Sequence, residues 1–209
     1  MQQSDMGAAE CLPRVGADVC ARLPGTRTSG ATRFRPSQSS SWTMKDGTQV
    51  IIRPICPEDE PLMVKFHGVL SDRTVYLRYF CSLSLASRTA HQRLVRICFA
   101  DPERQIVLLA SHTNPSTGEQ SILAVGRLNK LPPKDEVEAA VLVSDEYQGR
   151  GLGSELLRRL IQVAREQKLD RVVAEMLRDN IVMQSVLKKL GFRLRLLDDP
   201  RYVRAVLEL

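Results

Sequence analysis

The sequence predicts an α/β fold of the α+β type, with a mixed, mostly antiparallel central sheet flanked by helices. Two observations indicate this fold. Three consecutive β-rich segments lie in the middle of the chain, and the turn "NPSTGEQ" joins the first two, as in a meander. The whole order is strand, helices, meander, helix, strand, helix and strands, which is not the regular βαβ repeat of an all-parallel sheet.

Residues 1–41 differ in composition from the rest of the chain. The stretch "RLPGTRTSGATRFRPSQSSS" is rich in Gly, Pro, Ser, Thr and Arg and poor in large apolar residues, so it buries too little surface to offset its ordering entropy. We predict a disordered tail or linker over 1–41 and one folded domain over 42–209. The alternative for the tail is a basic arm that binds an acidic partner.

The first part of the predicted domain is one strand followed by helices. A strand is expected over 47–55, and helices over 57–70, 71–80 and 87–99. Pro57 and the acids after it suit a helix start, and Ser71 and Ser87 are the expected N-caps of the next two helices.

The second part contains the meander and the alternating elements. Strands are expected over 104–113, 120–131, 135–145, 170–177 and 201–209, and helices over 153–167 and 180–192. Gly191 suits the C-terminal end of the last helix.

Composition limits the possible functions. With 43% hydrophobic and 26% charged residues, no apolar run of roughly 20 residues and no secretory signal, a cytoplasmic protein without membrane contact is expected. The net charge of +6 fits a nucleic acid, an acidic protein surface, a phosphate-bearing cofactor or a solvated basic surface, but 5% aromatic residues argue against nucleic acid. The five cysteines form no CxxC pair, so we expect reduced thiols and no metal site.

Three glycines, Gly149, Gly151 and Gly153, lie where the third meander strand gives way to a helix. Glycine permits φ > 0 and lets a ligand approach the main chain, and the helix presents free N–H groups and the positive end of its dipole there. Together these features favour a phosphate site, and Arg150 adds a cation. The structural alternative is a tight turn that packs the helix closely.

Two familiar phosphate motifs fit this loop poorly. A P-loop requires Gly-Lys-Ser/Thr, and no such lysine follows the glycines. A dinucleotide site requires GxGxxG early in a βαβ unit, whereas this loop lacks the third glycine and follows a meander. Glu175 lies at a suitable distance to imitate the ribose-binding acid, so a dinucleotide remains a weak alternative.

The segment "QGRGLG", residues 148–153, resembles the Q/R-x-x-G-x-G/A signature of the GCN5-related N-acetyltransferase (GNAT) family. Three other segments, "VLVSDEY", "DNIVMQSVLKKLGF" and "VIIRPICPEDEPLM", resemble the same family, so the likeness covers about 42–209. The stretch "IRPICPEDEPLMVKFHGVLSDRTVYLRYF" resembles the acetyltransferase domain of bacterial protein lysine acetyltransferases in particular.

The resemblance implies the GNAT fold, acetyl-CoA as cosubstrate and no metal. It implies that the strand residues before the loop, Val141, Leu142 and Val143, hold the acetyl arm through their backbone. It assigns the pyrophosphate to the loop and helix start, which are Gln148, Gly149, Arg150, Gly151, Leu152, Gly153 and Ser154. Asn180 is an N-cap by its position, and the resemblance adds a bond to the pantetheine arm.

The resemblance also implies a catalytic residue. Glu138, in "EAAVLVSD", matches the position of the general base in lysine-acetylating relatives. Glu175 is the rival base, and the structural alternative for Glu138 is a solvated acid at a strand end. Many family members carry a Tyr, as general acid, where this chain has Leu187, so the acid stays unassigned; Tyr147 is a weak substitute.

We therefore expect an acyltransferase that acetylates lysine side chains of proteins, an acyl-CoA synthetase among the possible partners, by direct attack on acetyl-CoA. One alternative is acetylation of a small amine, which a pocket closed by the early helices would favour. The other is a non-catalytic module that senses acetyl-CoA, which Leu187 keeps open. Cys98 lies on an apolar helical pattern and is expected in the core rather than as a nucleophile.

Overall fold

The computed structural model describes residues 39–101, 104–131 and 136–209. The predicted tail therefore lies outside the described residues except for its last three positions. The first strand, β1 (Ser40–Thr43), begins two residues before the predicted domain boundary at residue 42. In the described part of the chain, no helix combines the length and the apolar character that crossing a bilayer requires.

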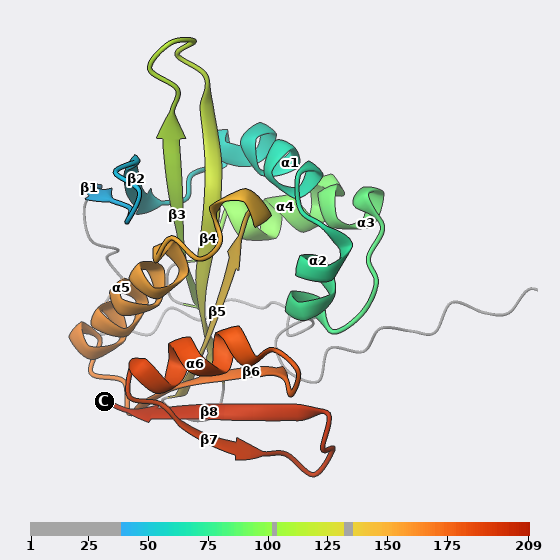
Figure 1. Cartoon of the computed structure of the whole chain (residues 1–209), viewed down its shortest axis with the longest axis vertical. Coiled ribbons are helices and arrows are strands. Elements are labelled where there is room, and N and C mark those ends of the chain that lie inside the picture. The colour runs from blue at the N-terminus through green and yellow to red at the C-terminus, as the bar shows by residue number, and fades with distance from the viewer. Residues whose placement is uncertain (1–38, 102–103, 132–135) are drawn as a thin grey trace, which may run out of the picture.

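An eight-stranded sheet organises the domain, with the strand order β1-β2-β3-β4-β5-β6-β8-β7. The strands after β1 are β2 (Gln49–Pro54), β3 (Gln105–Thr113), β4 (Gln120–Leu131), β5 (Glu136–Val143), β6 (Arg171–Leu177), β7 (Arg193–Leu196) and β8 (Tyr202–Glu208). Of the described strands only β5 and β6 pair in parallel, so the predicted mixed, mostly antiparallel sheet is confirmed. The sheet twists strongly, and β6, β8 and β7 run across the direction of β3 and β4 (Figure 1).

Six α-helices accompany the sheet within the described ranges, besides two 3-10 turns at Pro57–Asp59 and Asp145–Tyr147. The α-helices are α1 (Glu60–Gly68), α2 (Asp72–Tyr79), α3 (Leu85–Thr89), α4 (His91–Cys98), α5 (Leu152–Glu166) and α6 (Ile181–Lys189). The expected helix over 87–99 is divided at Ala90, and its N-cap is not Ser87 but Ser84, whose side chain accepts a hydrogen bond from the Ser87 amide. The Ser71 N-cap is confirmed by the Thr74 amide, which donates to its side chain over 3.2 Å.

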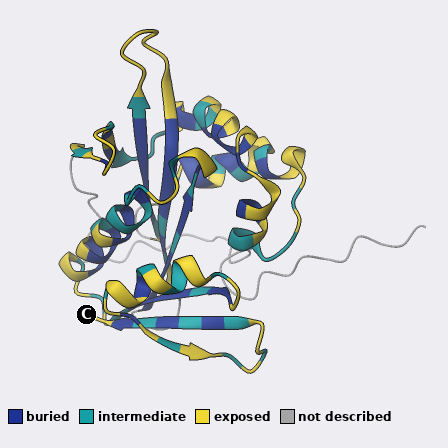
Figure 2. Ribbon diagram, in the orientation of Figure 1, coloured by how far each residue is buried: buried dark blue, intermediate teal, exposed yellow. Residues whose placement is uncertain are grey.

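The core consists of two apolar clusters on opposite faces of the sheet. Neighbouring residues of β3, Leu108 and Leu109, belong to different clusters, as the alternation of side chains along a strand requires. The helical residues of the first cluster come from α5 and α6, and those of the second come from α1, α2 and α4. Figure 2 shows the central strands buried between these layers. Cys98 lies in the second cluster, as predicted.

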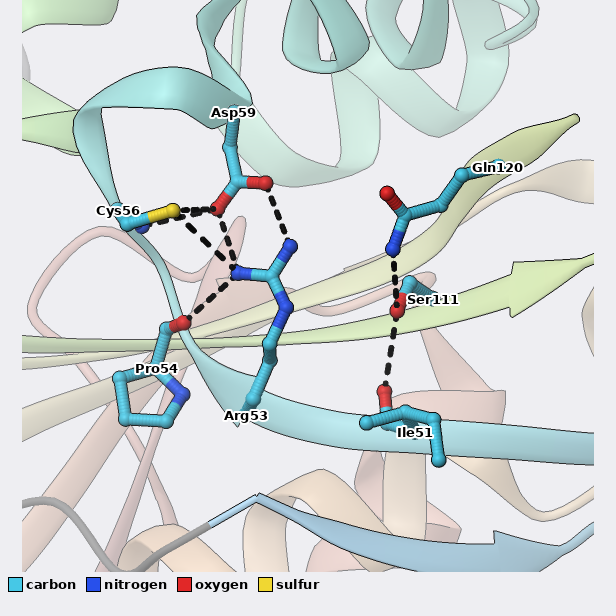
Figure 3. A network of polar contacts seen from close by, with 7 residues as sticks. All are labelled: Ile51, Arg53, Pro54, Cys56, Asp59, Ser111 and Gln120. Carbon is cyan, nitrogen blue, oxygen red and sulfur yellow. Dashed lines mark hydrogen bonds and ion pairs between the residues drawn. The ribbon is translucent and has the colours of Figure 1, made fainter.

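The turn from β2 into α1 is held by a buried ion pair. Arg53 donates to both carboxylate oxygens of Asp59, over 2.7 and 2.6 Å, and the Cys56 amide donates to the same carboxylate over 2.8 Å (Figure 3). This pair fixes the direction in which α1 leaves the sheet, because a buried carboxylate must keep its partners. As a result, Met63 and Phe66 of α1 pack into the second cluster.

The cysteines follow the sequence prediction in part. Cys56 and Cys98 are free thiols. Cys81 is disulfide-bonded, so the expectation of reduced thiols is wrong at this position. The spacing of cysteines along a chain does not show which sulfur atoms meet in the fold.

Candidate active site

The parallel strands β5 and β6 separate after a short pairing. They are in register from Glu136 and Arg171 to Glu138 and Val173, whereas β5 continues to Val143. The other edge of β5 stays paired with β4 up to Val143. The backbone groups of 139–143 that face β6 therefore have no partner in that strand. This places Val141, Leu142 and Val143 beside an opening, where their main chain can bind a ligand.

The glycine loop between β5 and α5 has the geometry of an anion site. Gly149 and Gly151 have φ of +75° and +91°, a left-handed conformation that residues with a Cβ rarely adopt. Gly151 is the N-cap of α5, and no side chain among the described residues caps this helix. The first amides of α5, at Leu152, Gly153 and Ser154, are therefore left to a ligand. Acetyl-CoA fits the site, because its pyrophosphate is the anion that such a helix start binds.

Two residues near the loop, Trp42 and Lys45, come from β1 and from the turn between β1 and β2. A Cβ on Gly151 would lie 3.5 Å from Cη2 of Trp42 and 3.6 Å from Cε of Lys45. Sequence reasoning missed both, because about a hundred residues separate them from the loop. Arg150 does not point freely into the opening, since it pairs with Asp46 and its guanidinium lies 5.0 Å from the ring centre of Tyr147. The side chain of Lys45 passes close to the start of α5.

The start of the loop is fastened to the N-terminal end of α2. The Asp145 carboxylate accepts hydrogen bonds from the Ser71 amide and hydroxyl, over 2.9 and 2.6 Å, and from the Thr74 hydroxyl over 2.7 Å. Gln148 donates to Thr74 Oγ1 and to the Val143 carbonyl, over 3.0 and 3.1 Å. Gln148 thus connects the loop to α2 and to the end of β5, a role that the sequence did not reveal.

Glu138 lies in β5 at the last residue before the two strands separate, with 8% of its surface exposed. It is not the solvated strand-end acid that the structural alternative described. Burial raises the pKa of Glu138; Arg78 and Arg127 oppose this rise, and Glu175 adds to it. A buried carboxylate with a raised pKa is a stronger base than one in water, which suits proton transfer.

The rival base, Glu175, is engaged in an ion pair. Arg204 donates to Glu175 over 3.3 Å and also pairs with Glu136, which is buried. Since Arg204 holds the carboxylate of Glu175, the rival base is less available to an amine than Glu138 is.

Asn180, Leu187 and Tyr147 can now be placed. Asn180 is the N-cap of α6, and its side chain accepts from the Met183 amide over 3.1 Å, which confirms the structural part of its prediction. Leu187 is fully buried in the first cluster, so the position where relatives carry a Tyr belongs to the core here. Tyr147 contacts Arg150. None of these three positions supplies an evident general acid.

A pocket lies on the opposite face of β5 from α5. It is a small, partly open hollow that α1, α2, α4, β4 and β5 line. Its polar lining is His67, Arg78, Tyr79 and Arg127, and the rest is apolar. Within the described ranges, no group of His, Cys, Asp and Glu side chains has the arrangement of a metal site.

Comparison with known proteins agrees with this geometry. The family model for the acetyltransferase (GNAT) domain matches residues 49–193. An acetyltransferase of Pseudomonas aeruginosa is 28% identical over 166 residues, which are 78% of this chain and 87% of that protein. The acetyltransferase Pat of Mycolicibacterium smegmatis is 28% identical over 148 residues, and the match spans 71% of this chain but 42% of Pat.

Among solved structures, the GNAT domain of PAT from S. lividans superimposes with a TM-score of 0.72 at 28% identity, covering 82% of this chain and 97% of that domain. The family match extends from β2 to the start of β7 and so includes the separated strands and the glycine loop. The chain belongs to the GNAT acetyltransferase family, whose members transfer an acetyl group from acetyl-CoA.

Proposed function

We propose that this chain transfers acetyl from acetyl-CoA to a primary amine, with Glu138 as general base. The observation that carries the proposal is the position of Glu138, a buried acid at the point where β5 and β6 separate. The glycine loop supports binding of the pyrophosphate, and the open edge of β5 supports binding of the acetyl arm. The loop and Glu138 lie at opposite ends of one strand, so both ends of the reaction belong to a single element.

The proposed reaction forms a C–N bond and breaks a C–S bond. The amine attacks the thioester carbonyl carbon, its proton passes to Glu138, and the sulfur leaves as thiolate. Backbone N–H groups of Val141–Val143 stabilise the charge that develops on the carbonyl oxygen. A base is needed because an alkylamine with a pKa near 10.4 is neutral in only about one molecule in 2,500 at pH 7.

The leaving thiolate has no assigned acid. Leu187, at the position where many relatives carry a Tyr, is an apolar side chain buried in the core and donates no proton. A thiol has a pKa of about 8.5, so the thiolate leaves without prior protonation at a tolerable energetic cost, and water protonates it afterwards.

Two acceptor classes remain candidates. A protein lysine is favoured by the likeness to proteins named Pat, and an acyl-CoA synthetase stays a proposed partner. A small amine is favoured by the pocket under α1, α2 and α4, because the early helices enclose it.

Glu138→Gln tests the base. We expect kcat to fall by about 10² to 10⁴, while acetyl-CoA binding is retained. The sequence has a single tryptophan. Because Trp42 lies beside Gly151, its fluorescence reports binding at the loop. Glu175→Gln is the comparison variant and should lose much less activity.

Full turnover by Glu138→Gln would remove Glu138 from this role, and a larger loss in Glu175→Gln would transfer the role to Glu175. Binding of acetyl-CoA by the wild-type chain, with no acetyl transfer to any amine, would favour the sensing module.

A further inference from the structure

The lining of the pocket beside β5 carries two positive charges, and both interact with the carboxylate of Glu138, which lies outside the lining. Among the described residues, its charged lining consists of Arg78 and Arg127, and no carboxylate lines it. Arg78 and Arg93 also place their guanidinium groups 5.2 and 4.8 Å from the ring centre of Tyr79. Arg93 of α4 is outside the lining and reaches the pocket only through its contact with Tyr79.

Several nitrogen atoms in this region lack hydrogen-bond partners. Arg127 donates from Nη2 to the neutral Gln105 side chain over 2.7 Å, but its buried Nε has no partner among the described residues. The same holds for Nε of Arg93 and for Nε and Nη1 of Arg88, a residue with 5% of its surface exposed. Buried donors on charged groups are expensive to leave unsatisfied. Of these three arginines only Arg127 lines the pocket, so its Nε is the donor that suits an incoming acceptor oxygen there.

Burial and neighbouring positive charges lower the pKa values of two groups in the pocket lining, Arg127 and His67. Burial, followed by the charge of Arg78, lowers the pKa of Arg127 to about 10, and it stays charged at pH 7. Burial, with Arg93 and Arg88 nearby, lowers the pKa of His67 to about 4, so His67 is neutral and offers hydrogen bonds only. The net charge of the pocket wall is therefore positive at neutral pH.

The proposed base, Glu138, lies two residues along β5 from Ala140, which is part of the pocket lining. Arg127 pairs across the sheet with Ala140, and the next inward-facing pair on the same strands is Asn129 with Glu138. Two residues along a strand span roughly 7 Å. An amine at Glu138 and an anionic group at Arg127 would therefore be separated by about the length of a short aliphatic chain.

We propose that this pocket binds a carboxylate of the acceptor, so that the enzyme selects amines that carry a carboxylate a few bonds away. The inference rests on the proposed acetyl transfer, and of the two acceptor classes it selects the small molecule. The aliphatic chain between the two groups then runs along β5 past Ala140, which is partly exposed. A phosphate group offers the same anionic oxygens, so the test includes it.

A matched pair of acceptors tests the proposal. 6-Aminohexanoate and hexylamine share the amine and the chain and differ in the carboxylate. We expect kcat/KM for 6-aminohexanoate to exceed that for hexylamine by about tenfold or more, mainly through KM. Arg127→Met and Arg78→Met should each remove most of this preference, whereas Arg165→Met, on the exposed side of α5, should keep it.

Equal kcat/KM for the two acceptors in the wild type would overturn the proposal. So would a preference that persists in both pocket variants. A purely electrostatic effect of the arginines on Glu138 would change the rates with both acceptors alike and leave their ratio unchanged. If Arg127→Met fails to fold, Arg78→Met and Arg127→Lys decide the matter, because lysine keeps the charge and should keep part of the preference.

A binding experiment separates this inference from the proposed function. Calorimetric titration of the chain with hexanoate, inorganic phosphate and hexylamine needs no turnover. Binding of hexanoate that weakens about tenfold or more in Arg78→Met, with hexylamine weak throughout, supports the carboxylate site even if no amine is acetylated. Phosphate binding tighter than hexanoate binding would reassign the site to phosphate, and binding of neither anion would overturn it.

Discussion

The two ends of the proposed reaction site are built in different ways. At the glycine loop, the ligand meets main chain: Gly149 and Gly151 adopt positive φ, and the start of α5 has no side-chain cap among the described residues. At the pocket, the ligand meets side chains, among them Arg78 and Arg127, that come from separate elements. One end offers bare backbone and the other offers charged groups.

The two ends differ in how they select a ligand. Backbone amides and a helix dipole attract any suitably placed phosphate and need only a short local sequence. Side-chain pockets depend on shape and charge, so they can discriminate among acceptors that share an amine. In the proposed reaction, main chain therefore holds the acetyl donor, which is constant, and side chains hold the acceptor, which varies.

The N-terminal ends of α2 and α5 differ in how their backbone amides are capped. The N-terminal end of α2 is capped by Ser71, and Asp145 accepts further hydrogen bonds from the Ser71 amide and hydroxyl. Asp145 belongs to the loop that leads into α5, and the N-cap of α5 is Gly151, which has no side chain to cap the helix. Since the chain has Ser and Asp at one helix start and Gly at the other, the free amides of α5 are kept for a ligand.

Gly151→Ala should have the largest effect of the changes considered at the loop end. A left-handed residue with a Cβ costs about 1–2 kcal/mol, and relief of that strain moves the α5 amides. We expect the Kd for acetyl-CoA, measured by Trp42 fluorescence, to rise by about tenfold.

Gly118→Ala is the matched control, because Gly118 has φ of +70° in the turn after β3 and a Cβ there would meet no described atom within 4 Å. Both variants should lose similar stability in chemical unfolding, but only Gly151→Ala should lose affinity. An equal loss of affinity in both would mean that the left-handed backbone at the loop has no special role in binding.

Asp145→Asn probes the connection between the two ends. The hydrogen bonds of Ser71 and Thr74 outweigh the burial that opposes ionisation, and they hold the pKa of Asp145 below its usual range. A carboxyl with a lowered pKa stabilises the fold above its unfolded pKa and loses this effect as pH falls through the folded value. We expect the free energy of unfolding to drop by about 1 kcal/mol at pH 7 and the two proteins to converge below about pH 4.

Urea unfolding at several pH values measures this difference, and Glu146→Gln, at the exposed neighbouring acid, is the control. A deficit that stayed constant down to pH 3 would show that the charge of Asp145 does not matter. A weaker affinity for acetyl-CoA in Asp145→Asn alone would show that α2 helps to position the loop.

Sequence reasoning predicted the loop end far better than the pocket end. Gly149, Gly151 and Gly153 lie in one short stretch of the sequence, and the first two adopt the positive φ that glycine permits. The family resemblance assigned the role of base to Glu138, at the other end of β5, and this assignment stays a prediction. Lys45, Asp145 and the pocket arginines were missed, because their roles depend on contacts between elements far apart in the chain.

The fold shows the same division between local and distant signals. The long strands and α5 were expected from periodicity, whereas the short edge strands β1 and β7 were not. Edge strands of four residues carry little pattern, and their pairing with β2 and β8 is a tertiary contact.

Arg78→Met should have the smallest effect, a shift in the pH dependence of the reaction at the pocket end. Burial raises the pKa of Glu138, and the charge of Arg78 opposes this rise, so removal of that charge raises the pKa further. A general base is active when deprotonated, and the acid limb of kcat/KM should therefore move to higher pH, by less than about one unit.

Hexylamine is the acceptor to use in this measurement, because it lacks the carboxylate that Arg78 is proposed to bind. The amine's own titration cancels in the ratio of variant to wild type, so the shift belongs to the enzyme. With Arg165→Met as control, a limb that moved to lower pH would mean that Glu138 is not the titrating base, and the pocket would then act on binding alone.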